Sequence, residues 1–546
     1  MRKFNKLTHL VGVFIYLVCS SHVGSPGVVF EGLLGSHRML AHIEPPDVIP
    51  GIALVTVVLP DNPTGVSLEA KPVYWSVGLD GTPTSDPLLP VKGEPGKYQL
   101  ELWFMGSGAS SVHVSMKEED QQYDATIPIL AMPTAQKDMP LGLGIVLSLL
   151  GLFLVVLMVT IVMASVGESL ISVGEKRSTP TRRKWLGLAV GTLSMVLILW
   201  GGKNWWDSEA AGYQRNIYKP IQGMADFLVI EEVPFLDLKI DPKELGQGGS
   251  SRKMGYLIPD HGKLMHLFLV KKGGLEVFAH LHPQRLDSLH FRTVLPELPA
   301  GDYHVFADIT RFTGFAETIV ADLSVPESRG FRLASYTGSL GADDSFLITN
   351  PIKSEVATLD SDFLLCGMPG VRVELGDGYE AIWESNVDRY EARRLHELTF
   401  ALFDPHGEAA VLQPYLGMMG HAVVMKHDGS VYIHLHPTGN YSMGAQEAMV
   451  NRFKTRKQGY TGIPSGITFM DSIDSVIDWL DAMPETERDS LLMGEMVHPV
   501  ITDGEHETHQ IVRFPYAFPE PGSYRVWVQV KIDGRVRQAA FDVEVV

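Results

Sequence analysis

The chain has 546 residues and a formal net charge of −19 at neutral pH. That length is enough for several domains, and the acidic balance argues against a nucleic-acid-binding protein, which needs a basic face. The two cysteines are Cys19, in the apolar N-terminal segment, and Cys366. The sequence therefore predicts no intrachain disulfide framework. Cys366 could be a metal ligand, but its apolar neighbours favour a buried small hydrophobe.

Residues 1–21 have the layout of a secretory signal peptide. Arg2, Lys3 and Lys6 precede the apolar run Leu10–Val18, and two small residues, Ser20 and Ser21, come after it. A positive start, a short apolar run and a small-residue cleavage site are typical of exported chains. An uncleaved anchor is the alternative.

Residues 25–137 are predicted to form an extracytoplasmic β-sandwich domain. Apolar and polar residues alternate over several short runs that proline and glycine clusters separate. The runs are Ile52–Leu59, Val73–Val77, Tyr98–Phe104 and Ser111–Met116. No functional site is predicted in this domain.

Two uncharged segments predict transmembrane helices over residues 141–164 and 185–202. Trp185 and Trp200 border the second segment, as in an interfacial aromatic belt. The connecting loop, residues 165–184, is basic, so the positive-inside rule places it in the cytoplasm. We therefore expect a protein of the bacterial inner (plasma) membrane, with large N- and C-terminal domains on the extracytoplasmic side.

The C-terminal half contains two copies of one pattern, Pro259–Pro283 and Pro414–Pro437. The copies read PDHGKLMHLFLVKKGGLEVFAHLHP and PYLGMMGHAVVMKHDGSVYIHLHP. After the first proline, a glycine and a histidine recur at the same spacing, and both copies end in His-Leu-His-Pro. Each copy is predicted to be a β-hairpin that carries three histidines.

The turns fix how the histidines face one another. Asp428-Gly429 predicts a two-residue loop that places His421 opposite His436, with His434 on the same face. In the first copy, a loop with an odd number of residues puts His266, His280 and His282 on one face. A two-residue Gly-Gly loop would instead put Met265 opposite His282.

Three imidazoles on one face suit a transition-metal ion. The predicted ligands are the six repeated histidines, together with two neighbouring thioethers that favour Cu(I). They are His266, His280, His282, Met265, His421, His434, His436 and Met419. Copper is the expected metal and zinc the second choice. A structural histidine cluster without metal is the alternative.

The fold class is expected to be mainly β: three immunoglobulin-like or cupredoxin-like antiparallel β-sandwich modules plus two transmembrane helices. The first repeat defines a module over residues 225–327, and the second defines a module over residues 355–546. The second module carries an insertion in which apolar residues recur at helical spacing from Ile467 to Leu480. The aspartates of this helix are expected to form a solvated face.

The stretch Tyr415–His421, with Asp428-Gly429 and His434-Leu435-His436-Pro437, resembles uncharacterised bacterial membrane-anchored proteins with HLHP-motif β-sandwich modules. It is also similar to periplasmic domains of the YtkA-like and copper-resistance kind. The resemblance covers mainly the two C-terminal modules. It implies an envelope protein and is compatible with copper handling.

The function expected from the sequence is metal handling or sensing in the cell envelope. The partners would be the membrane, a metal ion and other envelope proteins, without nucleic acid. The alternative is a structural or protein-interaction scaffold of the envelope. An enzyme is not expected, because the chain has no nucleophile elbow, phosphate loop or HExxH motif.

Overall fold

The computed structural model describes most of the chain and divides it into two compact units. The first unit comprises residues 1–131 and 220–546, and the second comprises residues 132–219. The predicted signal peptide lies outside the described residues. Described are residues 22–23, 27–168, 173–174, 181–245, 254–327, 340–352, 366–385, 387, 389–454, 465–495 and 511–546.

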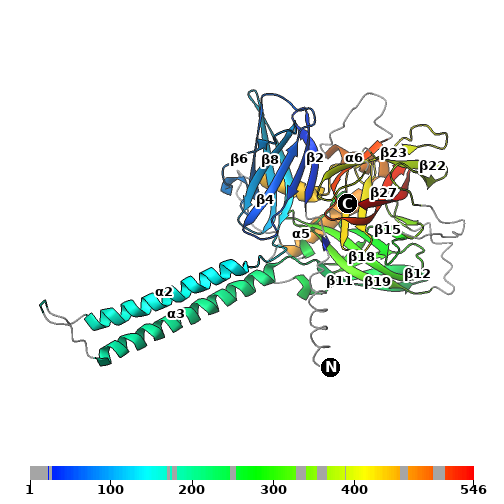
Figure 1. Ribbon diagram of the computed structural model, residues 1–546. Coiled ribbons are helices and arrows are strands. Elements are labelled where there is room, and N and C mark those ends of the chain that lie inside the picture. Colours follow the sequence, from blue (N-terminus) through cyan, green and yellow to red (C-terminus); the bar gives the residue numbers. More distant parts are fainter. Residues whose placement is uncertain are drawn as a thin grey trace, which may run out of the picture. The chain divides into compact units, whose positions relative to one another are not determined.

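The second unit is a pair of long helices, α2 (Leu141–Glu168) and α3 (Thr181–Asn216), which lie side by side (Figure 1). They include both predicted membrane spans, but α3 begins before the second span and continues past it. Gly187 and Gly191 allow close approach, since a Cβ on Gly187 would lie 3.0 Å from the Cα of Met163. The most apolar stretch of α2 contains no buried residue.

The N-terminal part of the first unit contains two sheets around one core. One sheet has the order β10-β9-β5-β6 and the other the order β2-β3-β4-β8-β7. Apolar residues from both sheets meet in a single cluster. The strands are β2 (Val28–Leu34), β3 (His37–Glu44), β4 (Gly51–Val58), β5 (Val66–Tyr74), β6 (Asp86–Pro87), β7 (Leu89–Pro90), β8 (Lys97–Phe104), β9 (Gly108–Glu118) and β10 (Gln121–Ala131).

The first C-terminal module follows α3 and is one continuous array of strands. Their order is β16-β17-β12-β11-β19-β18-β14-β15-β20, with β13 beside β18. The strands are β11 (Ile221–Ile230), β12 (Val233–Ile240), β13 (Leu257–Ile258), β14 (His266–Lys271), β15 (Val277–Leu281), β16 (Gln284–Asp287), β17 (His290–Val294), β18 (Gly301–Arg311), β19 (Ala316–Val325) and β20 (Ser345–Ile348). The predicted boundaries of this module, residues 225–327, omit β20, which pairs with β15.

The second C-terminal module has two sheets around one core. One contains β25-β24-β27-β28, with the two residues of β1 (His22–Val23) beside β25, and the other contains β21-β22-β23-β26. The strands are β21 (Arg372–Gly376), β22 (Tyr379–Glu384), β23 (Leu395–Phe403), β24 (His421–Lys426), β25 (Val431–Leu435), β26 (Ile511–Ala517), β27 (Gly522–Ile532) and β28 (Arg535–Val545).

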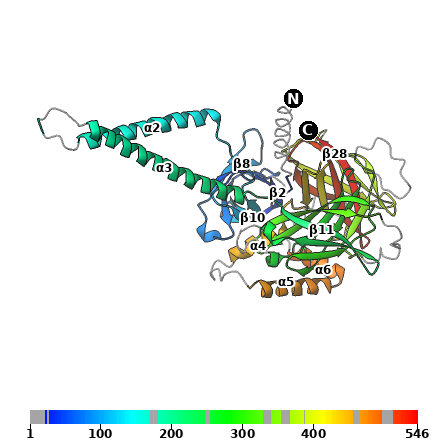
Figure 2. The same cartoon turned by 90° about the horizontal axis from the view of Figure 1, so that it is seen from below.

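The predicted insertion in this module contains three helices, α4 (Met443–Lys454), α5 (Gly466–Asp481) and α6 (Glu485–Glu495), drawn in orange in Figure 2. The expected amphipathic helix is α5. Ile473 and Ile477 pack against the core of the first module. Its aspartates are not all free in solvent, because Asp474 pairs with Arg285 and Asp481 pairs with Lys263.

Both repeats are β-hairpins in the predicted register. In the second, Ala422 pairs with Leu435 and Val423 with His434, as a two-residue Asp428-Gly429 loop requires. In the first, Leu267 pairs with Leu281 and Phe268 with His280. That pairing needs an odd loop, so the histidine face forms and the alternative Gly-Gly register does not.

The two hairpins pack against each other through the faces that carry the histidines. A separate apolar cluster joins the modules there and includes Phe268, Phe278, Val423 and Trp527. Phe278 stacks on Trp527 with the ring centroids 4.8 Å apart. Tyr432 stacks on Phe306 at 4.1 Å, with the ring planes 6° apart. The histidines continue this interface beyond the aromatic rings.

Candidate metal centre

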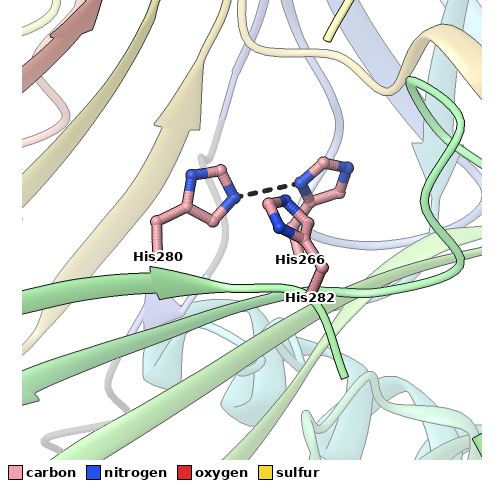
Figure 3. Close-up of side chains that lie close together, drawn as sticks. All are labelled: His266, His280 and His282. Atoms are coloured by element: carbon pink, nitrogen blue, oxygen red, sulfur yellow. Dashed lines mark hydrogen bonds between the residues drawn. The ribbon is translucent and has the colours of Figure 1, made fainter. Parts of the chain in front are cut away.

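The first triad consists of His266 at the start of β14, His280 on β15 and His282 just after β15 (Figure 3). The antiparallel register brings the three rings to one face of the hairpin. One nitrogen from each ring lies within 4.8 Å of the other two. The predicted convergence of these three side chains is therefore observed, in a geometry that could hold a metal ion.

In each ring of the first triad, one of the two nitrogens makes a hydrogen bond to a group outside the triad. His266 Nε2 donates to the carbonyl oxygen of Asp260 at 3.0 Å. His280 Nδ1 donates to Gln529 Oε1 at 2.9 Å, and His282 Nδ1 donates to Asp344 Oδ1 at 2.8 Å. Such contacts orient metal-binding imidazoles and fix their tautomers.

A neutral imidazole carries one proton, so in each ring the nitrogen that faces the other histidines has no proton and can only accept. His266 Nδ1 and His280 Nε2 face each other at 3.1 Å, and His282 Nε2 is buried with no hydrogen-bond partner among the described residues. Two lone pairs at this distance repel unless a cation lies beside both. Two metal–nitrogen bonds of ~2.05 Å at a tetrahedral angle place the nitrogens about 3.3 Å apart, so the spacing suits a shared ion.

The second triad, His421, His434 and His436, repeats this arrangement on β24 and β25. Its ligand nitrogens also lie within 4.8 Å of one another, with His421 Nδ1 and His434 Nε2 at 3.3 Å. His421 Nε2 donates to the carbonyl of Tyr415 and His436 Nδ1 to that of Tyr441. His436 Nε2 is buried and without a hydrogen-bond partner in the described part of the chain.

The two triads lie next to each other at the module interface. Between triads, the ring centroids of His266 and His434 are 5.5 Å apart, and those of His280 and His434 are 5.7 Å apart. Within triads, the centroid distances run from 4.5 Å to 5.4 Å. His261, which the sequence did not single out, places its ring 4.5 Å from His436 and 5.4 Å from His421.

Burial favours the neutral form of five triad imidazoles, which is the form that binds a metal. Burial, reinforced by neighbouring imidazoles, lowers the pKa of His266 to about 3. The same causes hold the pKa of four other rings well below the usual value. They are His280, His421, His434 and His436.

Two acidic groups, Asp308 and Asp260, border the histidines, and burial raises their pKa values. Burial raises the pKa of Asp308 to about 6, although Thr318 and Tyr432 donate hydrogen bonds to it. Burial also raises the pKa of Asp260. A cation bound by the imidazoles would favour the ionised form of both carboxyl groups.

The predicted sulfur ligands lie in hydrophobic surroundings. Met265 belongs to the core of the first module, and Met419 packs against the core of the second. Cys366 packs against the apolar cluster between the modules, as a small hydrophobe would. Burial raises the pKa of its thiol to about 11, so it is not a thiolate at neutral pH. The structure thus groups the six predicted histidines, while Met265 and Met419 remain predicted ligands.

Sequence reasoning missed the residues that surround the triads, namely His261, Asp260, Asp308, Asp344 and Gln529. His261 did carry a usable signal, because it stands inside the first repeat where the second has Leu416. Both residues adopt a left-handed backbone, with φ of 51°. Asp260 precedes His261 inside the first repeat, but the second repeat has Tyr415 at that place, so no repeated spacing points to it. Asp308, Asp344 and Gln529 lie outside both repeats, and no local spacing points to them.

Comparison with known proteins assigns no function. A family model for a domain of unknown function, DUF8832, matches residues 373–462 and 491–546. No curated protein matches. The chain is therefore similar, over part of the second module, to a family without a described role.

Among solved structures, an endo-fucoidan hydrolase of glycoside hydrolase family 107 matches 91% of this chain at 8% identity and a TM-score of 0.13. Latent PorU from Porphyromonas gingivalis matches 95% of this chain at 8% identity and a TM-score of 0.13. The BSP domain of a biofilm associated protein matches 96% of this chain over 84% of its own length, at 7% identity and a TM-score of 0.13. The chain spans less than half the length of the first two structures, 42% and 34%. Likenesses this distant support no functional inference.

Proposed function

We propose that this chain is a membrane-anchored envelope protein that binds copper through its two histidine triads and serves in copper handling or sensing. The observation that carries the proposal is the pair of facing imidazole nitrogens in each triad, 3.1 Å and 3.3 Å apart. In both triads the first histidine donates its other nitrogen to a backbone carbonyl. A buried site built of lone pairs is suited to a cation.

Copper is favoured over other ions by the donor set. Imidazole suits zinc, copper and nickel, and nitrogen sites bind copper most tightly among the divalent first-row metals. The grouped side chains are neutral, so they also suit the singly charged cuprous ion. Zinc is the second candidate, since three imidazoles with an open fourth position are a zinc arrangement too.

The membrane part of the proposal is supported by α2 and α3. Their candidate spans, Leu141–Val166 and Arg182–Asn216, have mean hydropathies of 3.1 and 1.7. The apolar side chains of α2 are exposed rather than buried inside the unit, and a bilayer would cover them. The basic loop before α3 supports a cytoplasmic position for that loop.

A scaffold without metal is the second candidate, because the histidine rings are buried and hydrogen-bonded at a well-packed interface. In that case His266 and His280 would share a proton instead of an ion. Metal analysis distinguishes the two candidates. The full chain, purified in detergent and dialysed against buffer with a trace of copper, should retain copper.

The decisive variant is His280→Ala/His282→Ala combined with His434→Ala/His436→Ala, which should retain none. His406→Ala, in an exposed loop, is the matched control and should behave as wild type. Equal copper content in the wild type and the fourfold variant would refute the metal proposal and leave the scaffold.

A further inference from the structure

We infer that the two triads are the halves of one dinuclear centre shared by both modules, rather than two independent sites. This inference rests on the proposed metal binding. Its first support is continuity. The spacings between triads, 5.5 Å for His266 and His434 and 5.7 Å for His280 and His434, nearly equal the 5.4 Å between His421 and His434 of one triad. Two bound ions would therefore be close neighbours.

The second support is that each triad is held by the opposite module. His280, in the first module, donates to Gln529 on β27 of the second. His434, in the second module, places Nδ1 3.7 Å from Asp308 Oδ2 on β18 of the first. Neither triad has its full set of orienting contacts unless both modules are docked. Because ions in the two halves would require the same docked interface, their binding is linked.

Charge gives the third support. Two copper ions bring at least two positive charges into a buried space lined by neutral rings, which is costly without nearby anions. Carboxylates border both halves. Asp344 contacts His282 and Asp308 lies beside His434, while Asp260 lies 3.5 Å from His261. The second half has no carboxylate of its own module in these contacts, so its charge compensation comes from the first module.

The fourth support is His261. Its ring lies 4.5 Å from that of His436 and 5.4 Å from that of His421, both in the second triad, and 6.0 Å from that of His266 in the first. It comes from the first module yet lies nearer to the second triad. A seventh imidazole, from the first module, thus lies beside rings of both triads.

The test uses the full-length chain in detergent, loaded with Cu(I) and then oxidised in air, with copper itself as the probe. A dinuclear centre predicts two copper ions per chain. It also predicts a Cu(II) EPR signal that integrates to well under the copper content or shows a half-field transition, because neighbouring spins couple. The His434→Ala/His436→Ala variant should hold one ion and give the uncoupled signal of a single Cu(II).

Other outcomes separate the two proposals. Absence of bound copper in the wild type would refute the proposed function itself. Two ions per chain with isolated, fully integrated Cu(II) signals would refute only the dinuclear centre. X-ray absorption of the Cu(I)-loaded wild type needs no variant and therefore does not depend on the variants folding. Copper–copper scattering is expected there, and its absence would also refute the dinuclear centre.

Discussion

Gln529, on β27 of the second module, accepts a hydrogen bond from His280, on β15 of the first module, at 2.9 Å. Gln529 is the cross-strand partner of His421 in its own module. Asp308 is likewise the cross-strand partner of His266 and approaches His434 of the second module. The two modules therefore exchange equivalent side chains across their interface. Their relation is a pseudo-twofold one, with an amide on one side and a carboxyl group on the other.

The aromatic contacts follow the same exchange. Phe278 and Tyr432 each stand two residues before the second histidine of their triads. Phe278 stacks on Trp527 of the second module, and Tyr432 stacks on Phe306 of the first. Buried Arg525 adds hydrogen bonds from the second module to the carbonyl oxygens of Leu275 and Asn350. The interface is thus packed and hydrogen-bonded, and it holds the histidines in fixed positions.

Replacing Gln529 tests whether this exchange matters for metal binding. Gln529→Leu removes the acceptor that fixes the tautomer of His280, so copper affinity should fall about 10- to 100-fold, the usual effect of losing an orienting contact. Gln529→Glu keeps an acceptor and should retain most of the affinity. Competition titration with a copper chelator measures both.

The control for this series is Gln99→Leu on β8 of the N-terminal domain, where the side chain of Gln99 donates a hydrogen bond to Thr56. It should leave copper affinity unchanged. Equal affinities for Gln529→Leu and wild type would show that the hydrogen bond to His280 has no role in binding.

Much of each hairpin could be predicted from the sequence because the information is local. Asp428-Gly429 determines the turn, and strand periodicity then places His421, His434 and His436 on one face. The meeting of the two hairpins was not predicted, since it depends on packing between segments about 150 residues apart in the sequence. A signal existed, because β14 and β24 are apolar on both faces, which indicates a second packing partner.

The lowered histidine pKa values predict that the metal-free chain loses stability in acid. A folded-state pKa below the unfolded value means that the unfolded chain binds more protons below pH ~6.5. Stability at the interface should therefore fall as the pH drops below that value, down toward the folded-state pKa, about 3 for His266. Each imidazole that stays neutral contributes ~1.4 kcal/mol per pH unit. The pKa values of Asp260 and Asp308 are raised, so these two carboxyl groups favour the folded state in acid. Their effect opposes that of the five histidines whose pKa values are lowered.

Hydrogen exchange, corrected for the intrinsic effect of pH, measures this loss locally. Amides of β14 and β24 should lose protection in acid, whereas those of β4, in the N-terminal domain, should lose less. Bound copper should raise the protection of β14 and β24 at every pH at which it stays bound, because it binds the folded state. The fall with pH should remain, since the ion also keeps the imidazoles unprotonated. A uniform response of all three strands would contradict the assignment to the histidine cluster.

The membrane topology can be tested independently of the metal. The measurement uses paired phosphatase and fluorescent-protein fusions in a bacterial host; the phosphatase is active only outside the cytoplasm and the fluorescent protein only inside it. If α2 and α3 cross a bilayer with the basic loop inside, the fluorescent protein should be the active reporter at Arg182. The phosphatase should be the active reporter after Val546. A cytoplasmic C-terminus would contradict placement of the triads in the envelope.

His261→Leu tests the seventh imidazole with a substitution that the fold itself provides. His261 occupies the same place in its turn as Leu416, and both have φ of 51°. The following glycines, Gly262 and Gly417, have φ of 76° and 74°. Leucine is thus already accommodated in this backbone conformation by the second module, and the variant should fold.

If His261 contributes to the centre, His261→Leu should weaken copper binding by at least about tenfold, the lower end of the effect of losing a supporting group. It should also alter the Cu(II) EPR spectrum, which a merely structural role would leave unchanged. The reciprocal variant Leu416→His is the matched comparison, because it adds an imidazole at the equivalent turn. Copper affinity and spectrum that match the wild type in His261→Leu would exclude this ring from the centre.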